Sequence, residues 1–216
     1  MKDLQTLAAE IHSCGRCPRL AEYLEQSRAR YPGYWSRPVA GHGDPEARLF
    51  ILGLAPGLHG ANRHGRVFTG DSSGRWLWGA LHALGASSAP DSIDAAHPLA
   101  LQGVWVSNAV RCVPPGNRPT GDELARCRDF LRRELEALPR VSVVLALGRL
   151  AHETYLKLRG LPLAAHPFAH GAMHALPGPP SLLDSYHPSR QNQNTGVLTW
   201  EMWLGVLGDA LRRSVA

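Results

Sequence analysis

The sequence predicts an α/β protein in which a parallel sheet is covered by helices on both sides. Short apolar runs alternate with segments of helical periodicity, which is the order of strands and crossover helices in such a sheet. The apolar run from Val141 to Leu147 is typical of a strand that is covered on both faces. Because the chain has 216 residues and no internal repeat, we expect 1–216 to form a single domain.

The first half of the chain predicts three helices and two strands. Apolar residues at helical spacing predict helices at about 3–12 and 20–28, and a third that starts after Asp71 and ends at Gly85. Strands are predicted at 49–52 and 104–106. The long segment after the first strand is rich in small residues, which lets the backbone approach a ligand closely.

The second half predicts two more strands and three helices. Thr120 and Glu123 have the spacing of a capping box, so a helix should begin after Thr120. The strand 141–147 leads through Gly148 into a helix that ends near 158. The last strand is expected at 181–186, after a possible short strand at 172–176, and a closing helix lies beyond 196.

The composition indicates a globular protein with a mildly basic surface. The net charge is +5, and all but two of the 23 Lys and Arg residues are arginine. A basic surface suits a polyanion such as nucleic acid, although the base composition of the coding DNA explains a preference for arginine equally well. No apolar run is long enough to span a membrane, and the N-terminus lacks a signal core. We therefore expect a cytoplasmic protein that does not bind a membrane.

Four cysteines predict a metal site. Cys14 and Cys17 form a CxxC pair, and Cys112 and Cys127 lie far along the chain. In the cytoplasm such residues serve more often as ligands than as disulfides. The spacing fits a structural zinc ion and a four-iron cluster alike. A redox dithiol is less favoured because no strand precedes the CxxC pair, and four free buried thiols are the alternative without a metal.

Polar residues follow the predicted strands, at the edge of the sheet where ligands bind. Asn108 and His187 each come directly after a strand, while Phe68 and Asp71 lie in the loop after the first one. Together they offer an aromatic face, an amide with donor and acceptor, and a carboxylate. Each has a purely structural alternative, as a helix cap, a turn residue or a core histidine.

Three further histidines recur at every fourth residue, at positions 166, 170 and 174. On a helix this spacing would indicate metal ligands. Because Pro167 and Gly171 disfavour a helix there, we expect these histidines to be structural or exposed.

Five motifs in order resemble the uracil-DNA glycosylase superfamily over nearly the whole chain. They are GLAPG at 53–57, VFTGDSSG at 67–74, SNAVRCVPPGNRP at 107–119, LALGRLA at 145–151 and YHPSRQNQNTG at 186–196. The chain is most similar to the iron–sulfur branches and, within them, to family 5, the UDGb type. Family 4 has a glutamate after the first glycine of its first motif, whereas this chain has Leu54, so the family 4 mechanism does not transfer.

The resemblance implies a three-layer α/β/α sandwich around a four-stranded parallel sheet. It implies a structural [4Fe-4S] cluster, in preference to zinc, on Cys14, Cys17, Cys112 and Cys127. It also implies a monomeric enzyme that flips uracil out of DNA and hydrolyses its N-glycosidic bond. A small residue at Ala55 suggests that other deaminated bases, such as hypoxanthine or xanthine, also fit.

The resemblance also assigns roles to residues. Asp71 activates water or stabilises the sugar cation, and His187 stabilises the carbonyl oxygen of the base. The expected substrate-binding residues are Gly53, Ala55, Phe68, Asn108 and Asn192. Among them, Phe68 stacks on the base, Asn108 reads its edge, and Asn192 supports the site or contacts DNA. The expected contacts with DNA come from Arg111, Arg118, Ser189, Arg190 and Gln191. Two alternatives are a metal-stabilised nucleic-acid-binding protein without catalysis and a hydrolase of free nucleosides or nucleotides.

Overall fold

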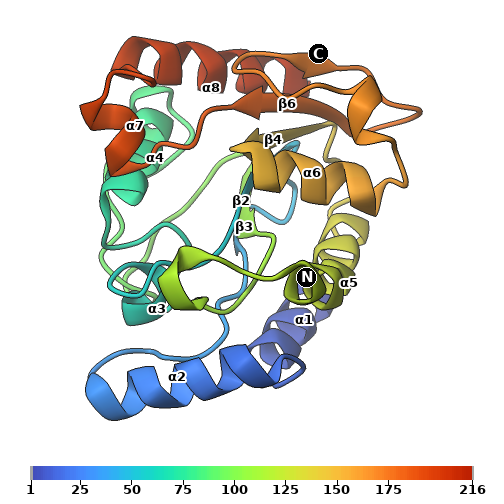
Figure 1. Cartoon of the computed structure of the whole chain (residues 1–216). Helices are drawn as coiled ribbons and strands as arrows, with labels where there is room; N and C mark the ends of the chain where they lie inside the picture. Colours follow the sequence, from blue (N-terminus) through green and yellow to red (C-terminus); the bar gives the residue numbers. More distant parts are fainter. Residues whose placement is uncertain (1, 216) are drawn as a thin grey trace.

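Four parallel strands form the centre of the sheet in the computed structural model, which describes residues 2–215 (Figure 1). They are β2 (Leu49–Gly53), β3 (Val104–Asn108), β4 (Val143–Leu147) and β6 (Ser181–Ser185), in the order β3-β2-β4-β6. Because neighbouring strands run in the same direction, their carboxyl ends meet at one edge, where Gly53 pairs with Asn108. The three-layer α/β/α fold is confirmed.

The sheet has six strands among the described residues, two more than the four predicted. Strand β1 (His42–Gly43) pairs antiparallel with β3, and β5 (Met173–His174) pairs antiparallel with β6. A strand of two residues leaves no periodicity in a sequence, which explains why β1 was missed. The short strand predicted at 172–176 corresponds to β5.

Eight helices surround the sheet in the described chain. They are α1 (Lys2–His12), α2 (Pro18–Arg30), α3 (Ala61–His64), α4 (Ser72–Ala83), α5 (Gly121–Glu136), α6 (Arg149–Leu158), α7 (Arg190–Asn194) and α8 (Trp200–Val215). The predicted capping box is present, because Thr120 and Glu123 bond to each other's backbone N–H groups. The short helices α3 and α7 were not predicted. None of the described helices combines the length and apolar character that crossing a membrane requires.

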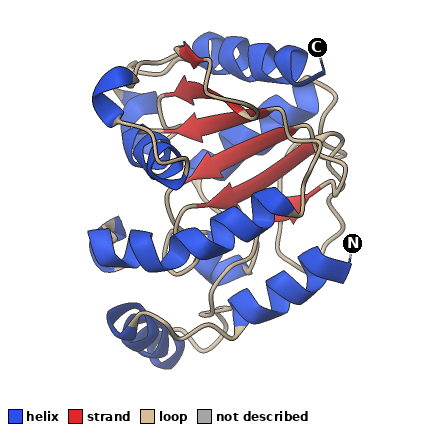
Figure 2. Cartoon of the chain, turned by 90° about the vertical axis from the view of Figure 1, so that its right-hand side faces the viewer, coloured by secondary structure: helices blue, strands red, loops and turns tan. Residues whose placement is uncertain are grey.

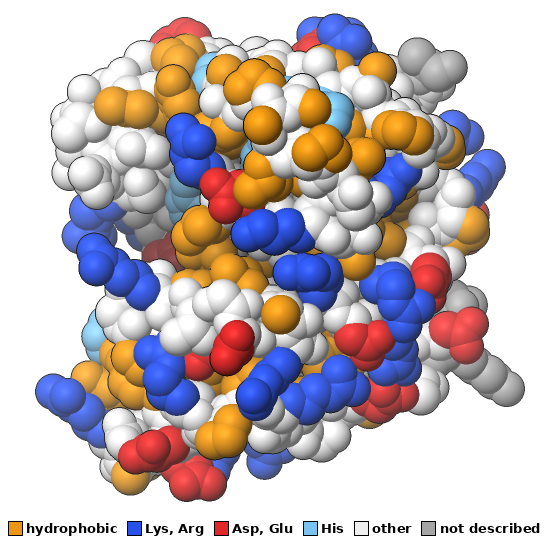
Figure 3. All heavy atoms as spheres, turned by 45° about the vertical axis from the view of Figure 1, so that its right-hand side comes forward, with side chains coloured by type: hydrophobic (Ala, Val, Ile, Leu, Met, Phe, Trp, Pro, Cys, Tyr) orange, Lys and Arg blue, Asp and Glu red, His pale blue; other side chains and the backbone are white. Residues whose placement is uncertain are grey.

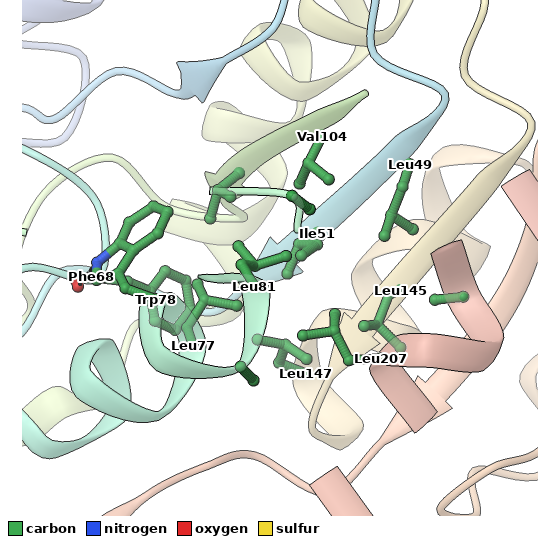
Figure 4. Packing of buried hydrophobic residues seen from close by; sticks show 14 of the residues in the cluster. Leu49, Ile51, Phe68, Leu77, Trp78, Leu81, Val104, Leu145, Leu147 and Leu207 are labelled. Atoms are coloured by element: carbon green, nitrogen blue, oxygen red, sulfur yellow. Dashed lines mark hydrogen bonds between the residues drawn. The ribbon is translucent and has the colours of Figure 1, made fainter. Parts of the chain in front are cut away.

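Helices α4 and α8 cover one face of the sheet. Leu77, Trp78 and Leu81 of α4 and Leu207 of α8 pack against the inward residues of the strands, such as Ile51 (Figure 4). These residues belong to one continuous cluster, in which Trp78 is fully buried. Two tryptophan side chains in this layer also donate to backbone carbonyls, so burial does not leave their N–H groups unpaired.

Helices α1, α5 and α6 cover the other face (Figure 2). Tyr155 of α6, Leu131 of α5 and Leu4 of α1 pack on the strand residues that point away from the first cluster. This alternation between the two faces along each strand follows from the pleat of a β-strand. Helix α2 lies beyond this layer and joins α1 in a separate cluster that includes Cys112 and Cys127.

A buried ion pair links the loop after β3 to α5. The Nη2 atom of Arg111 donates to Oε2 of Glu134 at 2.7 Å, and its Nη1 atom donates to the Ser107 hydroxyl. The two charged side chains are only 1% and 2% exposed. Glu134 also accepts the backbone N–H of Gly41. Removing one member of such a pair leaves an uncompensated charge in the interior.

We therefore predict that Glu134→Leu destabilises the protein by about 3–5 kcal/mol. The matched control is Glu136→Leu on the same helix, where an exposed carboxylate pairs with Arg132 at the surface. Urea denaturation of both variants, followed by circular dichroism, measures the free energy of unfolding. Similar losses in the two variants would contradict the prediction.

Candidate active site

A cavity of about 330 Å³ opens at the carboxyl edge of the sheet. Six of the predicted site residues line it, namely Ala55, Phe68, Asp71, Asn108, His187 and Ser189. The structure thus brings together side chains from three segments that are far apart in sequence. Residues to which no role was assigned also line it, including Pro56, Gly57, Ser73 and Asn117. Of these, Asn117 lies in a loop whose prolines and glycine were noted, and it has a positive φ of 58°.

Asp71 stands at the N-terminus of α4. Its Oδ1 atom accepts the backbone N–H of Gly74 at 2.8 Å, so the carboxylate is held as the N-cap. Burial raises the pKa of Asp71 above its ordinary value, while backbone N–H groups of Ser73 and Gly74 oppose that rise. The charges of Arg75 and Arg190 also favour the ionised form. The Asp71 carboxylate therefore serves both as the N-cap of α4 and as part of the cavity wall.

Glycines leave room for the other carboxylate oxygen. A Cβ atom on Gly60 would overlap Oδ2 of Asp71, and one on Gly57 would lie 3.4 Å from it. The loop after β2 can therefore pass directly against the carboxylate because Gly60 has no side chain, whereas a Cβ atom on Gly57 would be in ordinary van der Waals contact.

Phe68 and Asn108 form the floor of the cavity. The Phe68 backbone has a positive φ of 50°, and its carbonyl accepts the indole N–H of Trp78 at 2.6 Å. Asn108 is 2% exposed, and its amide forms no side-chain hydrogen bond within the described structure. A Cβ atom on Gly53 would overlap both the Asn108 amide oxygen and the Phe68 ring. Gly53 thus lets an aromatic face and an uncommitted amide lie side by side.

His187 faces Phe68 across the cavity. The two rings are roughly parallel, at 26°, with their centroids 6.2 Å apart. The surrounding protein withholds water from the charged imidazole and lowers the pKa of His187 to about 4. The ring is therefore neutral at pH 7 and has one N–H to donate.

Asn192 orients the His187 loop. Its Nδ2 atom donates to the His187 carbonyl at 2.9 Å, and its backbone N–H donates to the Ser189 hydroxyl. Asn192 is not among the residues that line the cavity. Its hydrogen bonds support the loop, which agrees with a supporting role rather than with contact with a base.

Gln193 connects the two sides of the cavity. Its Oε1 atom accepts the Ser72 hydroxyl at 2.6 Å, and its Nε2 atom donates to the Pro188 carbonyl at 2.8 Å. Ser72 follows Asp71, and Pro188 follows His187. Gln193 thereby fixes the distance between the two predicted catalytic side chains. Nothing in the sequence set it apart from its polar neighbours.

Four of the five residues predicted to contact DNA are accessible. Arg118, Arg190 and Gln191 are exposed, and Ser189 is partly exposed at the cavity. Arg111 differs because its guanidinium is buried against Glu134. That placement argues against the predicted phosphate contact, and Arg111 is left out of the DNA-facing residues below. Elsewhere, arginine side chains are spread among acidic ones, as on the face in Figure 3.

The four cysteines line a second, smaller cavity between the N-terminal helices and α5. All four are free thiols, and the Sγ atom of Cys127 accepts the backbone N–H of Arg111 at 3.4 Å. Burial raises the pKa of Cys127 to about 11 and raises that of Cys112 as well. The apolar surroundings include Leu20 and Phe130.

The distances between the cysteine sulfurs bear on the kind of metal. Among the described residues, only one group of three or more Cys, His, Asp and Glu side chains has all its ligand atoms within 4.8 Å of one another, and it contains no cysteine. In tetrahedral zinc sites the sulfurs lie about 3.8 Å apart, as bonds of about 2.3 Å require. The wider spacing suits a group larger than one ion.

Comparison with known proteins places the chain in a family. The model of the uracil DNA glycosylase superfamily matches residues 40–206. The chain belongs to the uracil-DNA glycosylase superfamily.

Curated relatives refine that placement. A type-5 uracil-DNA glycosylase from Thermus thermophilus is 50% identical over 97% of this chain and 98% of its own. Another, from Pyrobaculum aerophilum, is 44% identical over 94% of this chain and 88% of its own. A type-4 uracil-DNA glycosylase from Archaeoglobus fulgidus is 31% identical over 73% of this chain and 66% of its own. The similarity is thus greater to these type-5 proteins, as the resemblance to family 5 implied.

Proposed function

We propose that this protein excises uracil from DNA by hydrolysing the N-glycosidic bond and leaving an abasic site. The observation that carries the proposal is the cavity at the sheet edge, which presents a buried unpaired amide, an aromatic ring, a carboxylate and a neutral imidazole to one ligand. A pyrimidine ring needs a flat partner and an edge partner with both donor and acceptor, and Phe68 and Asn108 offer these.

The charges of the reaction match the two sides of the cavity. Breaking the bond leaves positive charge on the sugar and negative charge on the base. The Asp71 carboxylate stabilises the first and can orient or deprotonate the attacking water, while a neutral His187 donates an N–H to the carbonyl oxygen of the leaving base. A donor aimed at a developing oxyanion contributes about 3–4 kcal/mol to lowering the barrier.

The DNA duplex lies across the mouth of the cavity in this proposal. Arg190 and Gln191 begin helix α7 beside His187 and are exposed, so one of them can occupy the space left by the flipped nucleotide. Arg118 and Ser189 supply phosphate contacts from two other loops. Action as a monomer stays a prediction.

We predict that Asp71→Asn slows release of uracil at least 100-fold while changing DNA affinity less than about threefold, because one catalytic charge is lost. Asparagine is also a good N-cap, so α4 should keep its start. A single-turnover assay on a duplex with one uracil opposite guanine, followed by alkaline cleavage of abasic sites, measures the rate.

Asp122→Asn, at the exposed first turn of α5, is the control and should retain full activity. An intact wild-type protein that binds the duplex without releasing uracil would favour a nucleic-acid-binding protein without catalysis. Activity on free deoxyuridine alone would favour a nucleoside hydrolase.

We further propose that the cavity admits other deaminated bases. Ala55 and Gly57 present little side-chain volume at the wall, and the cavity of about 330 Å³ has space for a purine. Hypoxanthine and xanthine carry a carbonyl group that the Asn108 amide can bond. We predict release of hypoxanthine in the single-turnover assay, and Ala55→Leu should slow this release more than the release of uracil. Duplexes with hypoxanthine that stay intact while uracil is cleared would contradict this proposal.

The four cysteines are proposed to hold a [4Fe-4S] cluster with a structural role. Their number, the absence of disulfides among them, their wide spacing and the N–H of Arg111 directed at Cys127 all suit such a cluster. When bound, the cluster supplies a covalent connection between the N-terminal helices and the loop after β3. It takes no part in the chemistry at Asp71.

We predict about four iron atoms and four sulfides per chain in anaerobically purified protein, with broad visible absorption. Cys112→Ser should remove most of the iron and lower the melting temperature, because the N-terminal helices lose their connection to β3. Ser13→Ala, next to Cys14 but with an exposed side chain, is the matched control. Stoichiometric zinc without iron would contradict the cluster.

A further inference from the structure

A second group of metal-ligating side chains lies away from the active site. Nδ1 of His152 is 2.8 Å from Oδ1 of Asp184, and Nε2 of His174 is 2.9 Å from Oδ2 of the same carboxylate. The Asp184 side chain is fully buried, that of His152 is 2% exposed, and that of His174 is 10% exposed. None of the three lines the catalytic cavity. From the sequence, His174 is expected only to be structural or exposed, and His152 carries no expected role.

Three elements bring these side chains together. Asp184 lies on β6, two residues after Leu182, which packs in the cluster beneath α6. Because alternate residues of a strand share a face, Asp184 also points toward α6, where His152 lies. His174 comes from β5, whose pairing places it opposite Leu182. The ligand atoms of the three residues all lie within 4.8 Å of one another.

A count of hydrogen-bond donors shows what this arrangement requires. Nε2 of His152 is 2.9 Å from the His166 carbonyl, which can only accept, so Nε2 carries the proton. In the neutral imidazole, Nδ1 then presents a lone pair to the Asp184 carboxylate. Either a proton or a metal ion must therefore lie between these two acceptors.

The surroundings favour a metal ion. A metal-bound histidine usually donates its other N–H to a carbonyl or a carboxylate, as His152 does here. If only a proton joined His152 to Asp184, a single oxygen of the carboxylate would suffice. The imidazole of His174 contacts the other oxygen, so the group contains two imidazoles and one carboxylate. That set suits a divalent transition ion such as Zn²⁺.

We propose that Nδ1 of His152, Nε2 of His174 and the Asp184 carboxylate bind one Zn²⁺ or a similar divalent transition ion. Zinc bonds of about 2.0–2.1 Å require nitrogen and oxygen ligands about 3.3 Å apart. The two nitrogen–oxygen distances therefore increase by roughly 0.5 Å when the ion binds. The ion joins β5, β6 and α6, and so fastens the loop-rich segment 161–180 to the edge of the sheet. The glycosylase reaction does not need the ion, because none of the three ligands lines the catalytic cavity.

Equilibrium dialysis of the full chain with its cysteine site loaded tests the proposal. Metal-free buffer with a zinc-specific chelator, then graded free Zn²⁺, gives zinc per chain by mass spectrometry, with iron counted in the same sample. We expect one zinc per chain in addition to any iron. His174→Gln should weaken zinc binding at least 100-fold. His97→Gln should leave it unchanged, because His97 also pairs with a carboxylate at 2.8 Å but at the exposed surface and without a second imidazole.

X-ray absorption of zinc bound to the wild-type protein supplies a result that does not depend on a variant. We expect only nitrogen and oxygen neighbours at about 2.0–2.1 Å. Sulfur neighbours at about 2.3 Å would assign the zinc to the cysteines and overturn the proposal. Wild-type protein that binds no zinc while its cysteine site is loaded would show a buried imidazolium–carboxylate pair instead, and would also overturn it.

Discussion

Parallel pairing of β2 with β3 and β4, and of β4 with β6, is the constraint on which the active site depends. Because the strands run in one direction, the loops that follow them emerge at one edge. Asn108 is the last residue of β3, and His187 follows β6 by two residues. Only this register brings an amide and an imidazole that are 79 positions apart in sequence to one cavity.

Backbone conformation then completes the geometry of the site. Asp71 is fixed by capping α4, and the glycines of the loop after β2 let the chain pass against its free oxygen. The backbone of Phe68 has a positive φ of 50°, which is rare for an aromatic residue. Its carbonyl accepts a hydrogen bond from the indole N–H of the buried Trp78. Strained or side-chain-free positions thus gather where the ligand is proposed to bind, as they do at many functional sites.

The sequence predicts those features that are local and leaves out those that depend on partners far along the chain. The Thr120 capping box and the four long strands follow from spacing and periodicity, and each is present. The buried position of Arg111 could not be predicted in this way, because no local sequence feature shows that Glu134 pairs with it in the interior. The same holds for Gln193, whose two partners lie in different loops, and for His152, which meets Asp184 only once α6 packs on β6. Family resemblance supplied most of the site residues, whereas the supporting contacts came only from the structure.

The cysteine site and the catalytic cavity share one segment of backbone. After Asn108, the N–H groups of Ala109 and Val110 continue the pairing to Gly53 and Leu54, and Cys112 follows two residues later. A cluster bound at Cys112, as proposed, would therefore fix the segment that carries the Asn108 amide without touching a base in the cavity. The buried pair formed by Arg111 acts on the same segment from the other side. The Asn108 side chain has no hydrogen bond of its own within the described structure, so its position depends on its backbone. The Arg111 ion pair fixes that backbone from within three residues of Asn108, and the proposed cluster at Cys112 would add a second attachment.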